Sequence, residues 1–207
     1  MGKRVVFTID KRMISKEKIF WEWFTINHKK IEEFITNRED YSIYTELTEK
    51  VKEYHNLLNP ELTQDEEGFY NLIITPDGIR EGVEPTTKLV YSAPEIEEWK
   101  FFRLRQPKDK FGLRINEVDV NIPDIKIVRK LDIENKSVDI IVCFKDYVEE
   151  NDDFKTVGFL MLDHVVGEIN VMTRIDSIDF LNWEDLKEEN DTFTLLELRK
   201  EIEEKLY

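Results

Sequence analysis

The stretch SAPEIEEWKFFRLRQP, Ser92–Pro107, predicts a helix end that leads into a strand. Pro94 stops the helix, because a proline disfavours helical backbone in the residue before it. Successive side chains of a strand point to opposite faces of its sheet. One face would then carry Trp99, Phe101, Arg103 and Arg105. Each face is apolar at its start and polar toward Pro107, so we expect the strand to begin in the core and to leave it.

The two arginines of this stretch have two interpretations. A guanidinium offers paired donors to carboxylate or phosphate groups, which favours a small-molecule binder or enzyme with a pocket between sheet and helices. The candidate ligand-binding residues for this interpretation are Trp99, Arg103, Arg105 and Glu168. Alternatively, Arg103 and Arg105 pair with the abundant Asp and Glu side chains of adjacent strands. The sequence leaves both interpretations open.

The segments on either side of this stretch indicate an α+β fold. Strand-like patterns occupy Lys3–Asp10, Glu61–Glu67, Gly68–Thr75, Trp99–Gln106, Gly112–Asn121, Ile125–Leu131, Val138–Tyr147 and Ile169–Leu181. Helical spacing of apolar residues follows Ser15, which we predict to be an N-cap, and recurs at Asp40–Leu58, Val83–Pro94, Phe154–Gly167 and Thr192–Tyr207. We predict an antiparallel or mixed sheet of about five to seven strands, with helices mainly on one face and a helical hairpin near the N-terminus.

The composition fits one folded domain over residues 1–207, with 41% hydrophobic residues. Residues 1–60 form a strand and a helical hairpin that can stand as an appendage, and residues 61–207 form a sheet-rich main body ending in an acidic helix. One cysteine excludes a disulfide within the chain. No run approaches the roughly 18 apolar residues of a membrane span, and no signal peptide is visible. We therefore expect a soluble cytoplasmic protein.

Negative charge is concentrated in the last third of the sequence. The formal net charge is −15, and residues 144–207, with 7 basic and 18 acidic side chains, account for −11 of it. Such a field repels nucleic acid and anionic membranes, and it attracts basic proteins. We expect a partner-binding surface made of Glu149, Glu150, Asp152, Asp153, Glu184, Asp185, Glu188 and Glu189. Solubility alone is the other explanation of this charge.

The segment LDHVVGE, Leu162–Glu168, raises the question of a metal site. On a continuous helix His164 and Glu168 would share a face and could bind a metal ion. The sequence favours a structural role instead, in which Gly167 ends the helix and Glu168 starts a strand. We predict no metal site and no cofactor.

The sequence contains none of the common catalytic motifs. It has no G-x-S-x-G, no Gly-rich phosphate loop and no H-E-x-x-H, and its acidic residues are too numerous for any pair to indicate glycosidase chemistry. No catalytic residue is predicted. The aromatic helix that contains Phe20, Trp21, Trp23 and Phe24 is expected either to pack in the core or to form an interface, and the second option suggests a structural homo-oligomer.

Three blocks of the sequence resemble a family of bacterial proteins with no assigned activity. The blocks are LIITPDG (Leu72–Gly78), APEIEEWKFFRLRQP (Ala93–Pro107) and LMLDHVVGE (Leu160–Glu168). The resemblance covers about Phe69–Asp179 and implies a small α+β domain, without catalytic residues to transfer. The leading functional hypothesis comes from the charge instead. It is a non-enzymatic, acidic binding protein of the bacterial cytoplasm, of an immunity or regulatory type, with a basic protein partner.

Overall fold

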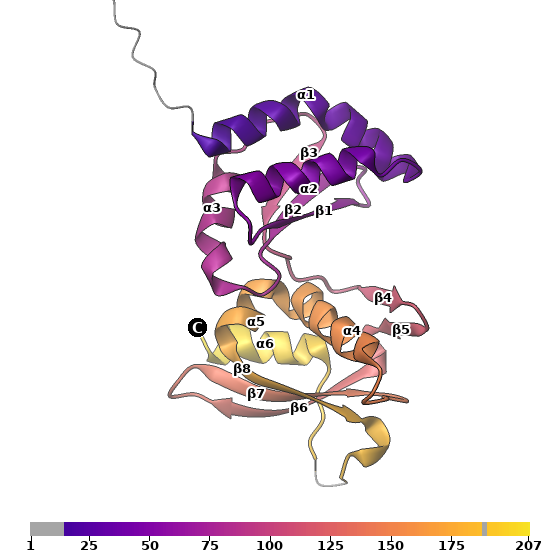
Figure 1. Ribbon diagram of the computed structural model, residues 1–207. Helices are drawn as coiled ribbons and strands as arrows, with labels where there is room; N and C mark the ends of the chain where they lie inside the picture. Colours follow the sequence, from indigo (N-terminus) through magenta and orange to yellow (C-terminus); the bar gives the residue numbers. More distant parts are fainter. Residues whose placement is uncertain (1–14, 188–189) are drawn as a thin grey trace, which may run out of the picture.

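The structure is a computed structural model that describes residues 15–187 and 190–207 (Figure 1). The strand expected at Lys3–Asp10 lies outside the described residues. Two hydrophobic clusters divide the chain into a first half, residues 15–103, and a second half, residues 112–207, and the connector between them is residues 104–111. The two halves are stacked in Figure 1, the first above the second.

The first half packs three helices against a three-stranded sheet. Its elements are α1 (Lys16–Asn37), α2 (Ser42–Tyr54), β1 (Asn59–Gln64), β2 (Tyr70–Thr75), the short η1 (Arg80–Gly82), α3 (Val83–Tyr91) and β3 (Trp99–Arg103). The central strand β2 is antiparallel to β1 and parallel to β3. A parallel neighbour requires a crossover connection, and α3 provides it.

Helix α1 begins at the predicted cap and is covered on more than one side. The Ser15 side chain accepts a hydrogen bond from the Lys18 amide, which satisfies one free donor of the first turn. Phe20 and Phe24 are buried toward the sheet, and Trp21 donates from Nε1 to the Leu89 carbonyl of α3 at 2.8 Å. Core packing therefore accounts for these aromatic side chains, and the homo-oligomer stays a prediction.

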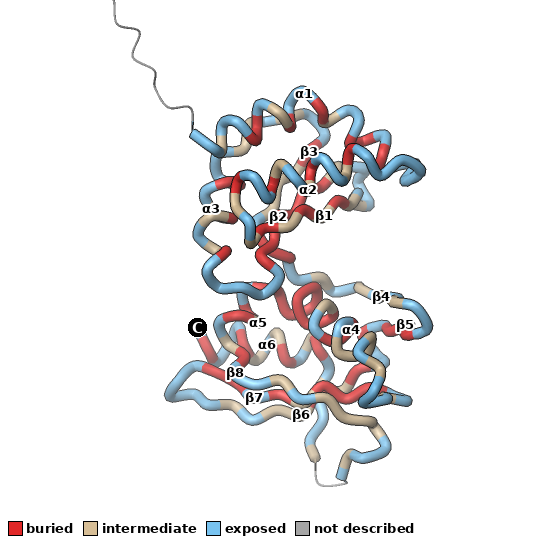
Figure 2. Tube along the Cα trace, in the orientation of Figure 1, coloured by how far each residue is buried: buried red, intermediate tan, exposed pale blue. Residues whose placement is uncertain are grey.

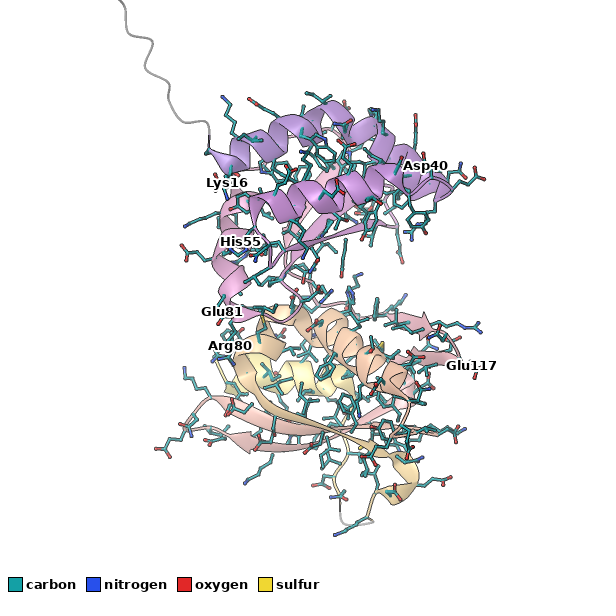
Figure 3. All side chains as sticks on the ribbon, in the orientation of Figure 1. Lys16, Asp40, His55, Arg80, Glu81 and Glu117 are labelled. Carbon is teal, nitrogen blue, oxygen red and sulfur yellow. The ribbon has the colours of Figure 1, made fainter. Side chains whose placement is uncertain are left out.

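The second half packs a second three-stranded sheet under helices and adds a hairpin at one side. Its elements are β4 (Gly112–Ile115), β5 (Val118–Asn121), η2 (Ile122–Asp124), β6 (Ile125–Asp132), β7 (Ser137–Phe144), α4 (Asp152–Leu162), the π-helical η3 (Asp163–Gly167), α5 (Glu168–Arg174), β8 (Ile175–Asn182), η4 (Trp183–Asp185) and α6 (Leu195–Lys205). Strand β7 is antiparallel to β6 and parallel to β8, while β4 and β5 form a separate hairpin with its turn at Glu117, labelled in Figure 3.

The two halves share one order of strands. In each, two antiparallel strands are followed by a helical crossover and a third strand parallel to the second, as β1-β2-α3-β3 and β6-β7-α4/α5-β8. The sequence contains no internal repeat from which this shared strand order could be predicted. Because the third strand pairs beside the second in both halves, the carboxyl ends of two neighbouring strands meet at one edge of each sheet.

The predicted α+β class is confirmed, but the prediction of one sheet is wrong. The described residues form three separate sheets, two of them mixed and one a two-stranded hairpin. Alternating hydrophobicity shows that a segment is a strand but does not specify its neighbour. The helical hairpin also shares a core with β1–β3, so the hydrophobic clusters separate at the connector rather than near residue 60. Whether residues 1–207 act as a single domain stays a prediction.

Two local predictions also require correction. Gly112–Asn121 is a hairpin rather than one strand, because Asn116 turns the chain in a left-handed conformation with φ of 51°. Ile169–Leu181 begins as the helix α5 and becomes the strand β8 only at Ile175. In Figure 2 buried segments follow the strands and the inner sides of the helices. Within the described residues, no helix is long and apolar enough to cross a membrane.

Candidate functional site

The most unusual feature of the molecule is a buried cluster of charged side chains around Arg105. The guanidinium is only 5% exposed and lies between the two halves. Its Nε donates to Glu61 Oε1 and its Nη1 donates to Asp163 Oδ2, each at 2.8 Å. Its Nη2 donates to both Glu61 and Asp77. The arginine therefore makes four hydrogen bonds to three carboxylates. We use the name Arg105 cluster for Arg105, these three carboxylates and the neighbouring Glu168.

Arg105 reaches the cluster because the strand β3 ends early. Leu104 adopts a left-handed conformation, with φ of 63°, and its amide donates to the Ile74 carbonyl at 2.9 Å. This breaks the alternation that placed Arg103 and Arg105 on one face, so that prediction is wrong. Leu104 is buried, and Arg105 turns toward the second half. A branched apolar residue gives no sequence signal for a left-handed turn.

Glu168 closes the cluster from the second half. It is fully buried and accepts hydrogen bonds from Thr75 Oγ1 at 2.6 Å, from the Gly78 amide at 3.1 Å and from the Arg105 amide at 2.9 Å. The prediction that Glu168 starts a strand is wrong, because Glu168 begins α5. Gly167 before it has φ of 97°, and a β-carbon added there would lie 3.3 Å from Cδ of Pro107.

The three sequence blocks therefore meet in space. Thr75 and Asp77 come from LIITPDG, Arg105 from APEIEEWKFFRLRQP, and Asp163 and Glu168 from LMLDHVVGE. The first two blocks end at the carboxyl edge of β2 and β3, and the third lies at the junction of α4 and α5. In Figure 3 the labelled Arg80 and Glu81 mark the lower end of the first half, where it approaches the second.

The cluster contains more carboxylates than cations, and this shifts the proton affinities of its members. Burial raises the pKa of Asp163 to about 7; the nearby Glu168 adds to this and Arg105 opposes it. For Arg105, burial opposes the charged form, but the hydrogen bonds and negative charge of Glu61 and Asp77 outweigh it and raise the pKa. The guanidinium therefore stays charged, and burial favours the protonated form of Asp163 near neutral pH.

His164 and Lys108 lie next to the cluster without joining it. Burial lowers the pKa of His164 to about 3, helped by the positive charges of Lys108 and Arg105. His164 stacks on Phe111 with ring centroids 4.3 Å apart, its Nε2 lies 3.9 Å from Glu61, and its Nδ1 has no partner in the described part of the chain. Within that part, no group of three or more His, Cys, Asp or Glu side chains is placed to hold a metal ion.

The structure brings together only two of the four predicted ligand-binding residues. Arg105 and Glu168 are partners in the cluster, where carboxylates already occupy the guanidinium. Trp99 lies in the hydrophobic cluster of the first half and donates from Nε1 to Glu32 at 2.9 Å. Arg103 is exposed, and its guanidinium lies 5.6 Å from the Tyr91 ring.

Sequence reasoning missed the acidic members of the cluster, Glu61, Asp77 and Asp163. Each lies in a segment with many other acidic residues, so charge alone does not distinguish it. The signal that could have identified two of them is the co-occurrence of the three blocks, since Asp77 and Asp163 each belong to one. Glu61 lies outside the blocks, and only the fold identifies it.

Four of the predicted partner-binding residues lie in the two segments that follow the paired ends of β7 and β8. Glu149 and Glu150 follow β7, while Glu184 and Asp185 lie in η4 directly after β8, and all four are exposed. Phe144 and Asn182, which end these strands, are paired neighbours, so the two acidic segments start side by side. We call the four residues the acidic edge.

The other predicted members of this surface lie nearby or outside the described residues. Asp152 and Asp153 start α4, and Asp153 accepts a hydrogen bond from Asn116 at 2.8 Å. Glu188 and Glu189 fall outside the described residues.

Comparison with known proteins adds no identification. No family model matches the sequence, no curated protein matches it, and no solved structure matches the fold. The resemblance to a bacterial family therefore stays a prediction.

Proposed function

We propose that the protein is a non-enzymatic, cytoplasmic binding protein that uses the acidic edge to bind a basic protein partner. An immunity-type protein that neutralises a basic toxin is one form of this function, and a regulatory protein is another. The observation that carries the proposal is the placement of the acidic edge. Two acidic segments that are 34 positions apart at their closest, Glu150 and Glu184, emerge side by side from paired strands.

The carboxylates of this edge have no ion-pair partner within the described residues. None of Glu149, Glu150, Glu184 and Asp185 lies within 4.0 Å of a basic nitrogen there. Their charges are thus available to an incoming basic surface, which increases the association rate and makes it depend on salt. The carboxyl edge of parallel strands is also where loops most often form binding sites in α/β proteins.

The alternative of an anionic ligand held by Arg103 and Arg105 has weaker support. The donors of Arg105 face Glu61, Asp77 and Asp163, and an anion would have to displace a carboxylate to bind there. Arg103 points elsewhere and is hydrogen-bonded to Thr87. The geometry favours a structural role for Arg105, and this supports the acidic edge as the binding surface in our proposal.

The test compares two variants that change net charge equally. One neutralises the acidic edge with Glu149→Gln, Glu150→Gln, Glu184→Gln and Asp185→Asn. The control neutralises four exposed acids elsewhere, Glu39, Glu49, Glu95 and Glu97, each to Gln. Affinity capture at about 50 mM and about 500 mM salt, with quantitative comparison of bound proteins, reads out the effect.

We expect a basic protein that the wild type and the control bind at low salt and that the acidic-edge variant does not. Equal loss in both variants would mean that net charge alone attracts the partner. Undiminished binding by the acidic-edge variant would place the interaction on another surface. Either result rejects the proposal.

A further inference from the structure

Strand β8 is an edge strand whose outer side has no neighbour in the described residues. Its inner side pairs in parallel with β7. Among residues 15–187 and 190–207, no backbone hydrogen bond joins β8 to a segment on its other side. The opposite edge strand β6 differs, because Ile127 exchanges two backbone hydrogen bonds with Phe193. An open strand edge presents unpaired N–H and C=O groups to an added strand.

The two faces beside this open edge have opposite chemical character. On the helix side, Ile178 and Phe180 belong to the hydrophobic cluster, and Phe159 of α4 lies with its ring 5.4 Å from Phe180 while 46% exposed. On the other side, Ser177, Asp179 and Leu181 alternate with them, and Asp179 is exposed. Asp176 is the extra residue at the register shift near the start of the strand, and it is exposed as well. The edge is thus apolar on its helix side, and its exposed charges are the carboxylates of Asp176 and Asp179.

We propose that β8 binds an extended segment of a basic partner protein, in which basic residues alternate with apolar residues, as an added strand. Residues alternate between the faces of a strand, so this pattern directs its apolar side chains to Phe159 and Phe180 and its basic side chains to Asp176 and Asp179. The inference rests on the proposed function and specifies how the partner binds.

The charge of the edge also explains why a second copy of the chain is not the expected occupant. Two β8 edges side by side would bring Asp176 and Asp179 of each copy close to those of the other. Like charges across a strand pair are destabilising, and acidic side chains are a known protection of open edges. The same negative charges attract a basic strand, so the charge of the edge favours a basic partner over a second copy of the chain.

The test uses a capped heptapeptide of alternating lysine and valine as the probe, with the full-length protein. Binding is followed by fluorescence anisotropy of a labelled peptide, and hydrogen exchange of the β8 amides is measured by NMR with and without it. We expect saturable binding and slower exchange at Ile175–Asn182. A peptide of the same sequence with N-methylated alternate amides, which cannot complete a strand, should bind at least tenfold more weakly.

The protein variant for this test is Asp176→Lys/Asp179→Lys, and its matched control is Glu95→Lys/Glu97→Lys in the first half. The first should weaken peptide binding at least tenfold, and the second less than threefold. Equal binding of the N-methylated peptide, equal effects of the two variants, or protection outside β8 would each overturn the proposal. Concentration-dependent dimers in sedimentation that the Asp176→Lys/Asp179→Lys variant alters would assign the edge to a second copy and also overturn it.

Failure here is distinguishable from failure of the proposed function. If a partner is captured by the wild type, lost in the acidic-edge variant and retained by Asp176→Lys/Asp179→Lys, the proposed function holds and strand addition at β8 is wrong. If both variants retain the partner, the proposed function itself is wrong.

Discussion

The first half and the second half carry different chemistry at the same place in the same strand order. At the carboxyl ends of β2 and β3, the chain places Thr75, Asp77 and Arg105, and the second half covers them with Glu168. At the carboxyl ends of β7 and β8, it places the acidic edge, which is exposed and has no arginine in it.

This difference shows how a single arginine changes the placement of nearby carboxylates. At the first of these edges, carboxylates from both halves pair with Arg105, and the edge is a buried contact between the halves. Where no arginine is present, the carboxylates repel one another and stay in water. The first edge therefore joins the two halves, and the second is exposed to solvent, where the proposed partner would bind. The following variants test this division.

The largest effect is expected for Arg105→Met. It leaves Glu61, Asp77 and Asp163 without their common counter-charge at a buried position, and breaking such a cluster costs about 3–5 kcal/mol. Urea unfolding at pH 7.5 measures the loss. Arg103→Met is the matched control, because Arg103 is exposed, and it should cost no more than about 0.5 kcal/mol. Equal losses in the two variants would show that Arg105 does not join the halves.

The second effect concerns the proton of Asp163. Burial raises its pKa to about 7 in the folded protein, so the folded state binds more protons than the unfolded state between about pH 4 and pH 7. Stability contributed by this group is full below pH 4 and is lost as the pH rises through 7. Asp163→Asn removes that loss, so its stability relative to the wild type should improve by about 1–3 kcal/mol from pH 5 to pH 8.

His164 supplies a comparison of opposite sign for the same measurement. Burial lowers its pKa to about 3, so the unfolded state binds the extra proton as the pH falls below about 6.5. His164→Phe should therefore gain stability relative to the wild type as the pH falls, whereas Asp163→Asn should gain as it rises. A difference between Asp163→Asn and the wild type that stays constant from pH 5 to pH 8 would contradict the role given to Asp163.

A smaller loss of stability is expected at Gly167, where the backbone turns next to the Arg105 cluster. Gly167 has φ of 97°, and a β-carbon there would lie 3.3 Å from Cδ of Pro107. Gly167→Ala should cost about 1–2 kcal/mol from the backbone conformation alone, with crowding added. Gly68→Ala is the matched control, because Gly68 has φ of 92° and no atom near its would-be β-carbon. Thermal unfolding of both variants separates the two causes, and equal losses would show that contact with Pro107 contributes nothing.

The elements of both halves could largely be predicted from the sequence, because each has a local pattern. Ser15 caps α1 as expected. The predicted run Gly68–Thr75 contains β2, and the runs Ile125–Leu131 and Val138–Tyr147 overlap most of β6 and β7. The parallel pairing of β2 with β3 and of β7 with β8 could not be predicted. It depends on where α3 and the α4/α5 segment direct the chain, which periodicity does not specify.

Only part of the Arg105 cluster could be predicted from the sequence. The sequence identified Arg105 and Glu168 as candidates and left open whether the arginine is paired or free. The decision depends on Leu104, whose left-handed backbone turns Arg105 away from Arg103, and on Glu61, which is brought in by a different strand. Neither has a local signal. The acidic edge shows the reverse case, because its residues were identified by charge and only their convergence required the fold.

The smallest effect on stability is expected at the acidic edge itself. Glu149, Glu150, Glu184 and Asp185 are exposed, so neutralising all four should change the free energy of unfolding by no more than about 0.5 kcal/mol per residue. The sign should be neutral or favourable at low salt, because removing like charges reduces repulsion in the folded state, and the gain should vanish as salt screens it. Thermal unfolding at about 20 mM and about 500 mM salt measures both points. A large, salt-independent loss would mean that these carboxylates hold the fold together as those around Arg105 do, and the contrast between the two edges would then be lost.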